Sequence, residues 1–135
     1  METITLEHDI EVFYVQADSF PMGIQAAFEK LTALPGNMTG RHLYGISRPE
    51  GGHGIIYRAA AAAKTPGEGA QYGLQSFTIR KGTYISEILP QYQQHLMEVT
   101  PTFERLLGTP GIDPQGYCLE DYFNDTDIRC MVPLK

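Results

Sequence analysis

The sequence predicts an α+β fold made of two β-α-β-β units that share an antiparallel sheet. A constant offset of 75 residues relates Phe-Glu-Lys-Leu at 28–31 to Phe-Glu-Arg-Leu at 103–106. The same offset relates the Pro-Gly pairs at 35–36 and 110–111, which are typical of helix ends. Two helices with matching motifs and matching stop signals indicate a duplicated unit.

The offset also extends to the strands that follow each helix. Continued without gaps, it lays Gly45 on Glu120, and residues 55–57 on residues 130–132. We therefore expect one domain over residues 1–135, with repeats at about 8–64 and 73–135. Glu120 has no acidic counterpart, so the carboxylate is not part of the shared scaffold.

In the first half, residues 10–17 read as a strand, followed by a helix that starts near Ser19 and Pro21. The buried helix face is expected to carry Ile24, Ala27, Phe28 and Leu31, which follow helical spacing. Strands are expected at 42–47 and 54–63, joined by a Pro-Glu-Gly-Gly turn. The five alanines at 59–63 favour a helix by propensity, but the repeat requires a strand there.

The second half follows a Pro/Gly-rich connector at 65–70. Strands are predicted at 74–79, 83–89, 117–123 and 128–134, with a turn or bulge at 81–82 and a short helix or loop at 91–99. The second helix is expected to begin with Thr100 as its cap and Pro101 at its first position. Its inner face is expected to carry Phe103, Leu106 and Leu107.

The composition excludes several functional classes. The net charge of −6, without a basic stripe, argues against direct nucleic-acid binding. No apolar run approaches the roughly 20 residues of a membrane helix, and the first residues lack a signal peptide. We therefore expect a cytoplasmic protein in which Cys118 and Cys130 are reduced thiols.

Glu120 is the most informative candidate residue. It lies in the strand-like run Tyr-Cys-Leu-Glu-Asp-Tyr-Phe, so alternation places Cys118, Glu120 and Tyr122 on one face. From these residues alone, Glu120 is either on a solvent-exposed face or held in an apolar site. In an aromatic site its pKa would be raised by desolvation, and a lipophilic cation would supply a counter-charge.

Other sites are less favoured by the sequence. The four histidines, at 8, 42, 53 and 95, show no paired ligand spacing, so neither a metal nor a cofactor is expected. Glu29 and Glu104 occupy matching helical positions and are expected to be solvated.

Most of the chain, and its second half above all, resembles the GyrI-like effector-binding family of drug-sensing activator domains and stand-alone proteins. The resemblance is carried by Gly-Thr-Tyr at 82–84, by Leu-Glu-Asp-Tyr-Phe-Asn-Asp at 119–125 and by Met-Val-Pro-Leu-Lys at 131–135. In the first half, Tyr-Gly-Ile at 44–46 resembles the matching strand. The resemblance implies two halves about a pseudo-two-fold axis, with a ligand cleft between them and a glutamate, Glu120, facing the cleft.

The function implied is a stand-alone, non-enzymatic binding protein for a small hydrophobic or cationic molecule, which sequesters it or signals to an unidentified protein partner. The expected lining residues are Glu120, Tyr122, Tyr44, Ile46, Tyr57, Phe20, Met22 and Tyr84. One alternative is a hydrolase of strained, cyclopropane-type electrophiles, with Glu120 as general base and Tyr122 or Tyr57 as orienting donor. Another is a protein-interaction domain with a filled core.

Overall fold

The computed structural model describes residues 1–135 except 36–37, 39 and 50–53. Its eight strands form one antiparallel sheet in the order β1-β6-β8-β7-β3-β4-β2-β5. They are β1 (Glu2–Leu6), β2 (Ile10–Gln16), β3 (Leu43–Pro49), β4 (Ile55–Ala62), β5 (Gln75–Ile79), β6 (Gly82–Leu89), β7 (Cys118–Tyr122) and β8 (Ile128–Pro133). With the helices α1 (Ile24–Thr32) and α2 (Val99–Leu107), this confirms the α+β fold. The expected helix stop at 36, the turn after Pro49 and His53 lie outside the described residues.

The element order β-α-β-β occurs twice, as β2-α1-β3-β4 and as β6-α2-β7-β8. The central six strands, β6-β8-β7-β3-β4-β2, keep the same order from either end when each strand is exchanged with its counterpart. The two outermost strands do not pair with the unit that follows them in the chain. β1 precedes the first unit but pairs with β6, whereas β5 precedes the second unit but pairs with β2. Each leading strand therefore completes the sheet of the other half.

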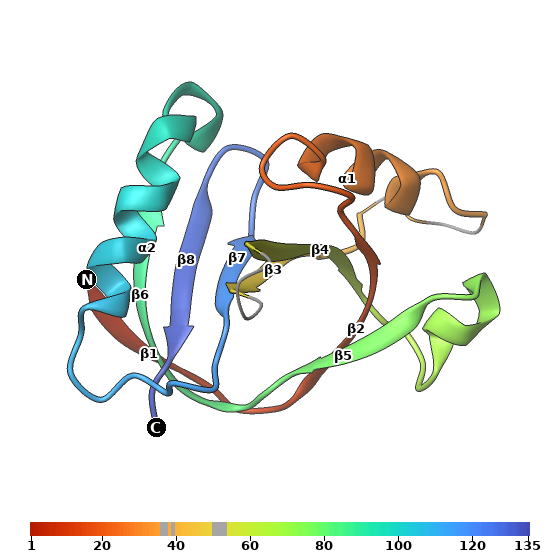
Figure 1. Cartoon of the computed structure of the whole chain (residues 1–135). Helices are drawn as coiled ribbons and strands as arrows, with labels where there is room; N and C mark the ends of the chain where they lie inside the picture. Colours follow the sequence, from red (N-terminus) through yellow and green to blue (C-terminus); the bar gives the residue numbers. More distant parts are fainter. Residues whose placement is uncertain (36–37, 39, 50–53) are drawn as a thin grey trace.

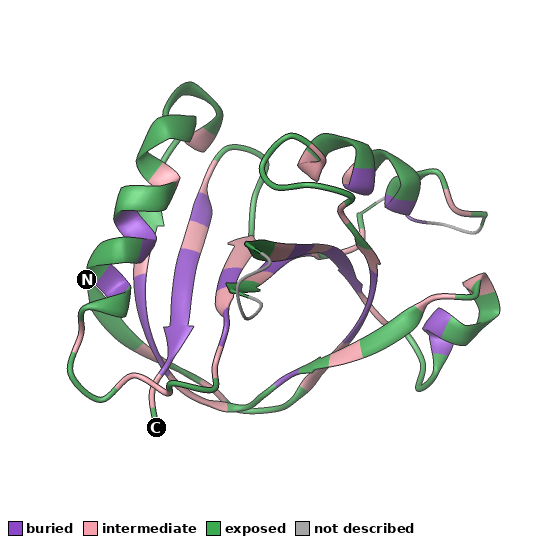
Figure 2. Ribbon diagram, viewed as in Figure 1, coloured by how far each residue is buried: buried purple, intermediate pink, exposed green. Residues whose placement is uncertain are grey.

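The sheet curls so that both helices lie on its outer side (Figure 1). Its inner face carries a core that includes Tyr14, Tyr44, Leu119 and Met131. On the outer face, α1 covers one core with β2 and β4, and α2 covers another with β6 and β8. Buried residues follow the strands and the sheet-facing sides of both helices (Figure 2). Within the described ranges, no helix has the length and apolar character needed to cross a membrane.

Both helices begin at positions other than those expected. α1 begins at Ile24 with Gly23 as its cap, because residues 20–23 form turns, closed by a hydrogen bond from the Gly23 amide to the Ser19 carbonyl at 3.1 Å. α2 begins earlier, at Val99, and Glu98 rather than Thr100 is its cap. Its inner face includes Phe103 and Leu106 as predicted, but Leu107 is 45% exposed.

The alanine run is part of strand β4, as the repeat predicted. Ala59 and Ala61 lie beneath α1 in its core, and Ala60 lies in the inner core; all three are fully buried. Small side chains allow the helix to approach the sheet closely. Tertiary packing therefore overrides the helical preference of alanine.

The strand pairing confirms one part of the ungapped alignment and corrects another. Gly45 and Glu120, which the offset relates, lie directly opposite one another in β3 and β7. In the outer ladders, however, Gly45 pairs with Ala59 and Glu120 pairs with Cys130. Ala59 therefore corresponds to Cys130, so the ungapped alignment of 55–57 with 130–132 was wrong by four residues. The β3–β4 ladder continues to Pro49 and Ile55, so the chain from Gly45 to Ala59 is four residues longer than the chain from Glu120 to Cys130.

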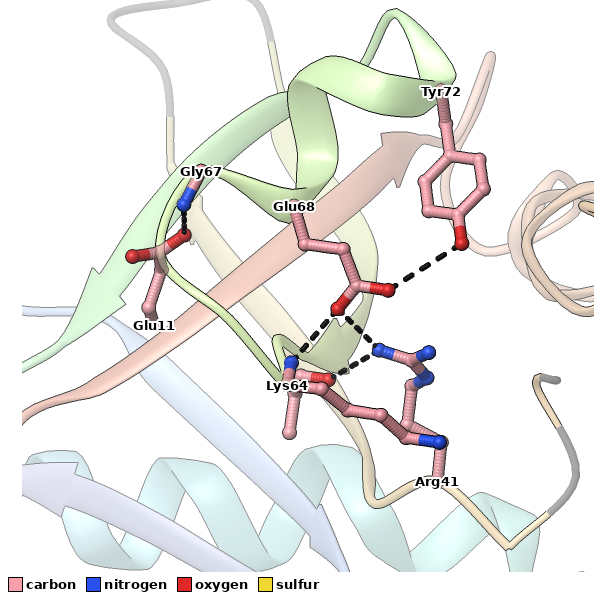
Figure 3. A network of polar contacts seen from close by, with 7 residues as sticks. Glu11, Arg41, Lys64, Gly67, Glu68 and Tyr72 are labelled. Atoms are coloured by element: carbon pink, nitrogen blue, oxygen red, sulfur yellow. Dashed lines mark hydrogen bonds and ion pairs between the residues drawn. The ribbon is translucent and has the colours of Figure 1, made fainter. Parts of the chain in front are cut away.

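The connector between the halves is held by a buried ion pair. The Arg41 guanidinium donates to the Glu68 carboxylate at 2.7 Å, and the two side chains are 4% and 8% exposed. The Lys64 amide and the Tyr72 hydroxyl also donate to Glu68 (Figure 3). These donors, Arg41 first, hold the pKa of Glu68 below its usual value. The short 3₁₀ helix η1 (Glu68–Tyr72) is thereby fixed beside β2 and β5.

Candidate functional site

Glu120 lies on the outer face of the sheet, at the centre of its middle strand pair. Its neighbour Leu119 belongs to the inner core, whereas Cys118 and Tyr122 pack against the α2 core on the outer face. Because side chains alternate along a strand, Glu120 shares the outer face with Cys118 and Tyr122. The predicted face assignment along β7 is thus confirmed.

Two tyrosines from different halves hold the Glu120 carboxylate. The Tyr57 hydroxyl donates to Glu120 Oε1 at 2.5 Å, and the Tyr122 hydroxyl donates to the same oxygen at 2.9 Å. The hydroxyls themselves are 3.2 Å apart. Among the described residues, no hydrogen bond is formed by Oε2, although Glu120 is only half-buried. We call Glu120, Tyr57 and Tyr122 the carboxylate–tyrosine group.

Gly45 provides the space that this group occupies. A methyl group added at Gly45 would overlap the Tyr57 hydroxyl and the Glu120 carboxylate. Any other residue at position 45 would therefore displace the partners of Glu120. The glycine is required here by close approach, not by an unusual backbone angle.

The electrostatics of the group follow from its partial enclosure. Burial raises the pKa of Glu120 above its usual value, while the hydrogen bonds from Tyr57 and Tyr122 oppose that increase. Burial, followed by the charge of Glu120, raises the pKa values of both tyrosines. The phenols therefore stay protonated and remain donors. Burial also raises the pKa of the neighbouring Cys118 thiol to about 11, which makes it a poor nucleophile.

Three further aromatic rings pack on the tyrosines of the carboxylate–tyrosine group. Phe20 stacks on Tyr57 with ring centroids 6.0 Å apart, and Phe28 of α1 meets Tyr57 and Tyr122 edge-on at 6.2 and 5.5 Å. Tyr92 meets Tyr122 edge-on at 5.6 Å. We call Phe20, Phe28 and Tyr92 the aromatic shell. Each half supplies part of the combined site.

The structure brings together only some of the residues expected to line one site. Glu120, Tyr122, Tyr57 and Phe20 are in contact, whereas Met22 is 87% exposed beyond Phe20. Tyr44, Ile46 and Tyr84 lie on the inner face, within the core on the other side of the sheet. They do not meet Glu120, because Tyr44 and Ile46 flank Gly45 and must point away from it.

The three inner-face residues have partners of their own. Tyr44 stacks on His42, whose imidazole pairs with Asp121, and burial raises the pKa of Tyr44 to about 12. The Tyr84 hydroxyl is shared with the Tyr117 hydroxyl at 2.6 Å and donates to the Arg80 carbonyl at 2.7 Å. These contacts stabilise the core.

Sequence reasoning missed Phe28 and Tyr92 as site residues. Phe28 packs against the α1 core, as its helical spacing predicted, but it is only half-buried and also contacts both tyrosines of the group. Its matching residue Phe103 is buried in the α2 core, so the shared motif concealed the difference. Tyr92 lies in a stretch without periodicity, where no signal could have identified it.

Two hollows lie away from the carboxylate–tyrosine group. One, of about 70 Å³, is lined by residues that include Arg80, Tyr84 and Asp113; a shallower one, of about 510 Å³, is lined in part by Met1, Ile85 and Gly108. The described part of the chain holds no group of three His, Cys, Asp or Glu residues arranged for a metal ion.

Comparison with known proteins shows the fold but not a family. No protein-family model matches the chain, and no curated protein matches its sequence. An integron cassette protein, VCH_CASS2 of Vibrio cholerae, matches with a TM-score of 0.71 at 16% identity over 99% of this chain and 95% of its own.

Two further solved structures extend this similarity. SAV2435, solved with bound tetraphenylphosphonium, matches with a TM-score of 0.64 at 14% identity, over 99% of this chain and 93% of its own. A protein from Staphylococcus aureus MU50, described as a putative bacterial transcription regulation protein, gives 0.56 at 14% identity over 99% and 97%. The fold is therefore one that occurs in a small-molecule-binding protein.

Proposed function

We propose that this protein binds a small lipophilic cation at the carboxylate–tyrosine group, with Glu120 as the counter-charge. The observation that carries the proposal is the state of the Glu120 carboxylate. One oxygen is fixed by two tyrosines, and the other has no partner among the described residues, in a half-buried position between aromatic rings. A desolvated carboxylate without a cation is unfavourable, so a cationic ligand would relieve a cost that the protein carries when empty.

The surroundings of Glu120 suit a cation with an apolar body. The rings of Phe28 and Tyr92 pack on Tyr122, whose hydroxyl donates to the carboxylate. Cation–π attraction at partly desolvated rings adds about 0.5–2 kcal/mol for each well-placed ring. The binding of tetraphenylphosphonium by SAV2435, a protein of the same fold, supports this ligand class. The resemblance to the GyrI-like family favours the same role for Glu120.

A thermal-shift experiment tests the proposal. Tetraphenylphosphonium should raise the melting temperature of the wild type, whereas triphenylphosphine oxide, which is neutral, should raise it less. Glu120→Gln should remove the response to the cation. Glu29→Gln is the matched control, because it removes the same charge from an exposed position on α1 and should respond like the wild type. A wild type that does not respond to the cation would contradict the proposal.

A hydrolase is the second candidate function. It is favoured by Oε2 of Glu120, the carboxylate oxygen that the tyrosines do not hold. Because burial raises its pKa, the Glu120 carboxylate is a stronger base than an exposed glutamate. Oε2 could accept a proton from a water that attacks a strained electrophilic ring. Turnover of a cyclopropane-type electrophile that disappears in Glu120→Gln while ligand binding survives would favour this candidate. Unchanged turnover in the variant would exclude Glu120 as the base.

A further inference from the structure

The two outer rings of the aromatic shell are attached to the protein in different ways. Phe20 lies in the segment between β2 and α1, is 38% exposed and belongs to none of the three cores. Among the described residues, the backbone hydrogen bonds of this segment are the Ala17 amide to the Tyr57 carbonyl, local bonds among residues 19–24, and the Ala27 amide to the Gly23 carbonyl at the start of α1. No side-chain hydrogen bond caps α1 where the segment ends. Among the described residues, Tyr57 is the aromatic ring on which the Phe20 ring packs.

Tyr92, on the opposite side, is anchored at several points. Its amide donates to the Thr126 carbonyl at 3.0 Å, and the Gln91 amide donates to the Asp127 carboxylate at 3.0 Å. Both bonds join the segment to the turn between β7 and β8. The Tyr92 ring also packs against the α2 core. Moving Tyr92 would therefore break contacts that moving Phe20 would not.

The position of Phe20 is also the position that a ligand ring would need. Phe20 and Tyr57 stack nearly parallel, with an interplanar angle of 28°. Tyr57 is 2% exposed, and its hydroxyl is bonded to Glu120. A ring on this face of Tyr57 would place a cationic centre attached to it close to the carboxylate. In the structure, the Phe20 ring fills this position.

We propose that Phe20 is a displaceable stand-in for an aryl ring of the ligand. The ligand class is then a cation that carries at least one aryl group. It enters on the Phe20 side, expels the Phe20 ring from Tyr57 and replaces it with its own ring, while Tyr92 stays in place as a wall. This inference rests on the proposed function, since it describes how the same site is filled.

Titration of tetraphenylphosphonium into three proteins tests the displacement. Phe20→Ala should bind the cation roughly fivefold more tightly than the wild type and associate faster, because no aromatic stack must be broken first. Tyr92→Ala, the matched control on the anchored side, should bind more weakly. Tetrabutylphosphonium, which has the same charge and no ring, should bind the wild type more weakly than the aryl cation does.

The outcomes separate this inference from the proposed function. If the wild type binds and Phe20→Ala binds equally or more weakly, displacement is wrong and the cation site stands. If neither protein binds, the cation site itself is wrong. Because the chain contains no tryptophan, Phe20→Trp adds a direct readout. Saturating ligand should shift its emission to longer wavelength as the ring enters solvent, and an unchanged emission would overturn the displacement.

Discussion

The two β-α-β-β halves have one architecture but contribute opposite features to the middle of the sheet. Where the second half has Glu120, the first has Gly45, and the two residues face one another across β3 and β7. Tyr122 corresponds by the same offset to Ser47. Tyr57 precedes Arg58, whose strand pairing matches that of Arg129, so its counterpart is the buried Ile128. No polar member of the carboxylate–tyrosine group is repeated.

This difference shows how a symmetrical scaffold can hold a single charge. Gly45 and Glu120, which the offset relates, are directly opposite one another in the central strand pair, so carboxylates at both positions would repel each other at close range. A glycine on one side removes both the second charge and the second side chain. The first half contributes space and aromatic surface, and the second contributes the acid.

The largest effect on stability is expected from the buried ion pair between Arg41 and Glu68, which the second half does not repeat. Glu68→Gln should lower the free energy of unfolding by about 3 kcal/mol, because it removes the negative charge from a buried ion pair. Urea denaturation at neutral pH measures the change. Arg105–Glu87, an ion pair of the second half with side chains 52% and 25% exposed, is the control, and Glu87→Gln should cost less than about 1 kcal/mol. Equal losses of stability in Glu68→Gln and Glu87→Gln would contradict the larger contribution expected from the Arg41–Glu68 pair.

The contribution of the Arg41–Glu68 ion pair to stability should decrease as the pH falls. The folded-state pKa of Glu68 is lowered, so its contribution is present above the unfolded value of about 4.3 and is lost as pH falls through the folded value. Wild type and Glu68→Gln should therefore converge in stability as the solution is acidified below that range. A difference that persisted at low pH would indicate a packing effect.

The second-largest effect is expected from giving a side chain to Gly45, which lies opposite Glu120 in the central strand pair. Gly45→Ala should cost about 2 kcal/mol of stability, because the added methyl group overlaps Tyr57 and Glu120. Binding of tetraphenylphosphonium should weaken as well, since the carboxylate loses its geometry. Gly108→Ala, at the end of α2, is the control, because a methyl there meets its neighbours only at ordinary contact distance of 3.5 Å. A stable Gly45→Ala that binds normally would show that close packing at 45 is unnecessary.

The smallest effect is expected from removing the hydrogen bond that Tyr57, in the first half, donates to Glu120. Tyr57→Phe removes the first of the two hydrogen bonds that lower the pKa of Glu120, so that pKa should rise further. The stability cost should be about 1 kcal/mol. Carboxyl ¹³C NMR titration measures the pKa. A pKa that falls or stays constant in the variant would contradict the role of Tyr57.

Glu120 itself gives the opposite dependence on pH. Its folded-state pKa is raised, so the folded protein binds this proton more tightly than the unfolded chain does. Stability should therefore decrease as pH rises from about 4.3 through the folded value, and Glu120→Gln should lack this decrease.

Local pattern was sufficient to predict both helices and every strand except β1, and to identify Glu120 and Tyr122 as neighbours on one face. Local pattern was not sufficient where a strand is stabilised by pairing with a strand far away in the sequence. β1 was not predicted, because a short strand near the start of the chain is stabilised by β6, about 80 residues away in the sequence. The inclusion of Tyr44 and Ile46 ignored a consequence of the offset. If Gly45 faces Glu120, the residues on either side of Gly45 must point to the other face.

Phe28 and Tyr92 could not be assigned for a different physical reason. Helical spacing identifies a residue that faces the sheet, but not whether the strand beneath supplies aliphatic or phenolic side chains. Phe103 lies in the α2 core, which includes Ile128, whereas Phe28 meets Tyr57 and Tyr122. The role of each phenylalanine is therefore set by its neighbours across the sheet.

The exchange of leading strands between the halves has a consequence for synthesis on the ribosome. When residues 1–64 have emerged, β1 has no partner, since β6 is still to be made, and the outer edges of β2 and β3 are open. The first half cannot complete its sheet until the second follows, although the two have the same architecture. Nascent chains are therefore expected to stay vulnerable to proteases until β8, the strand that pairs with both β6 and β7, leaves the exit tunnel.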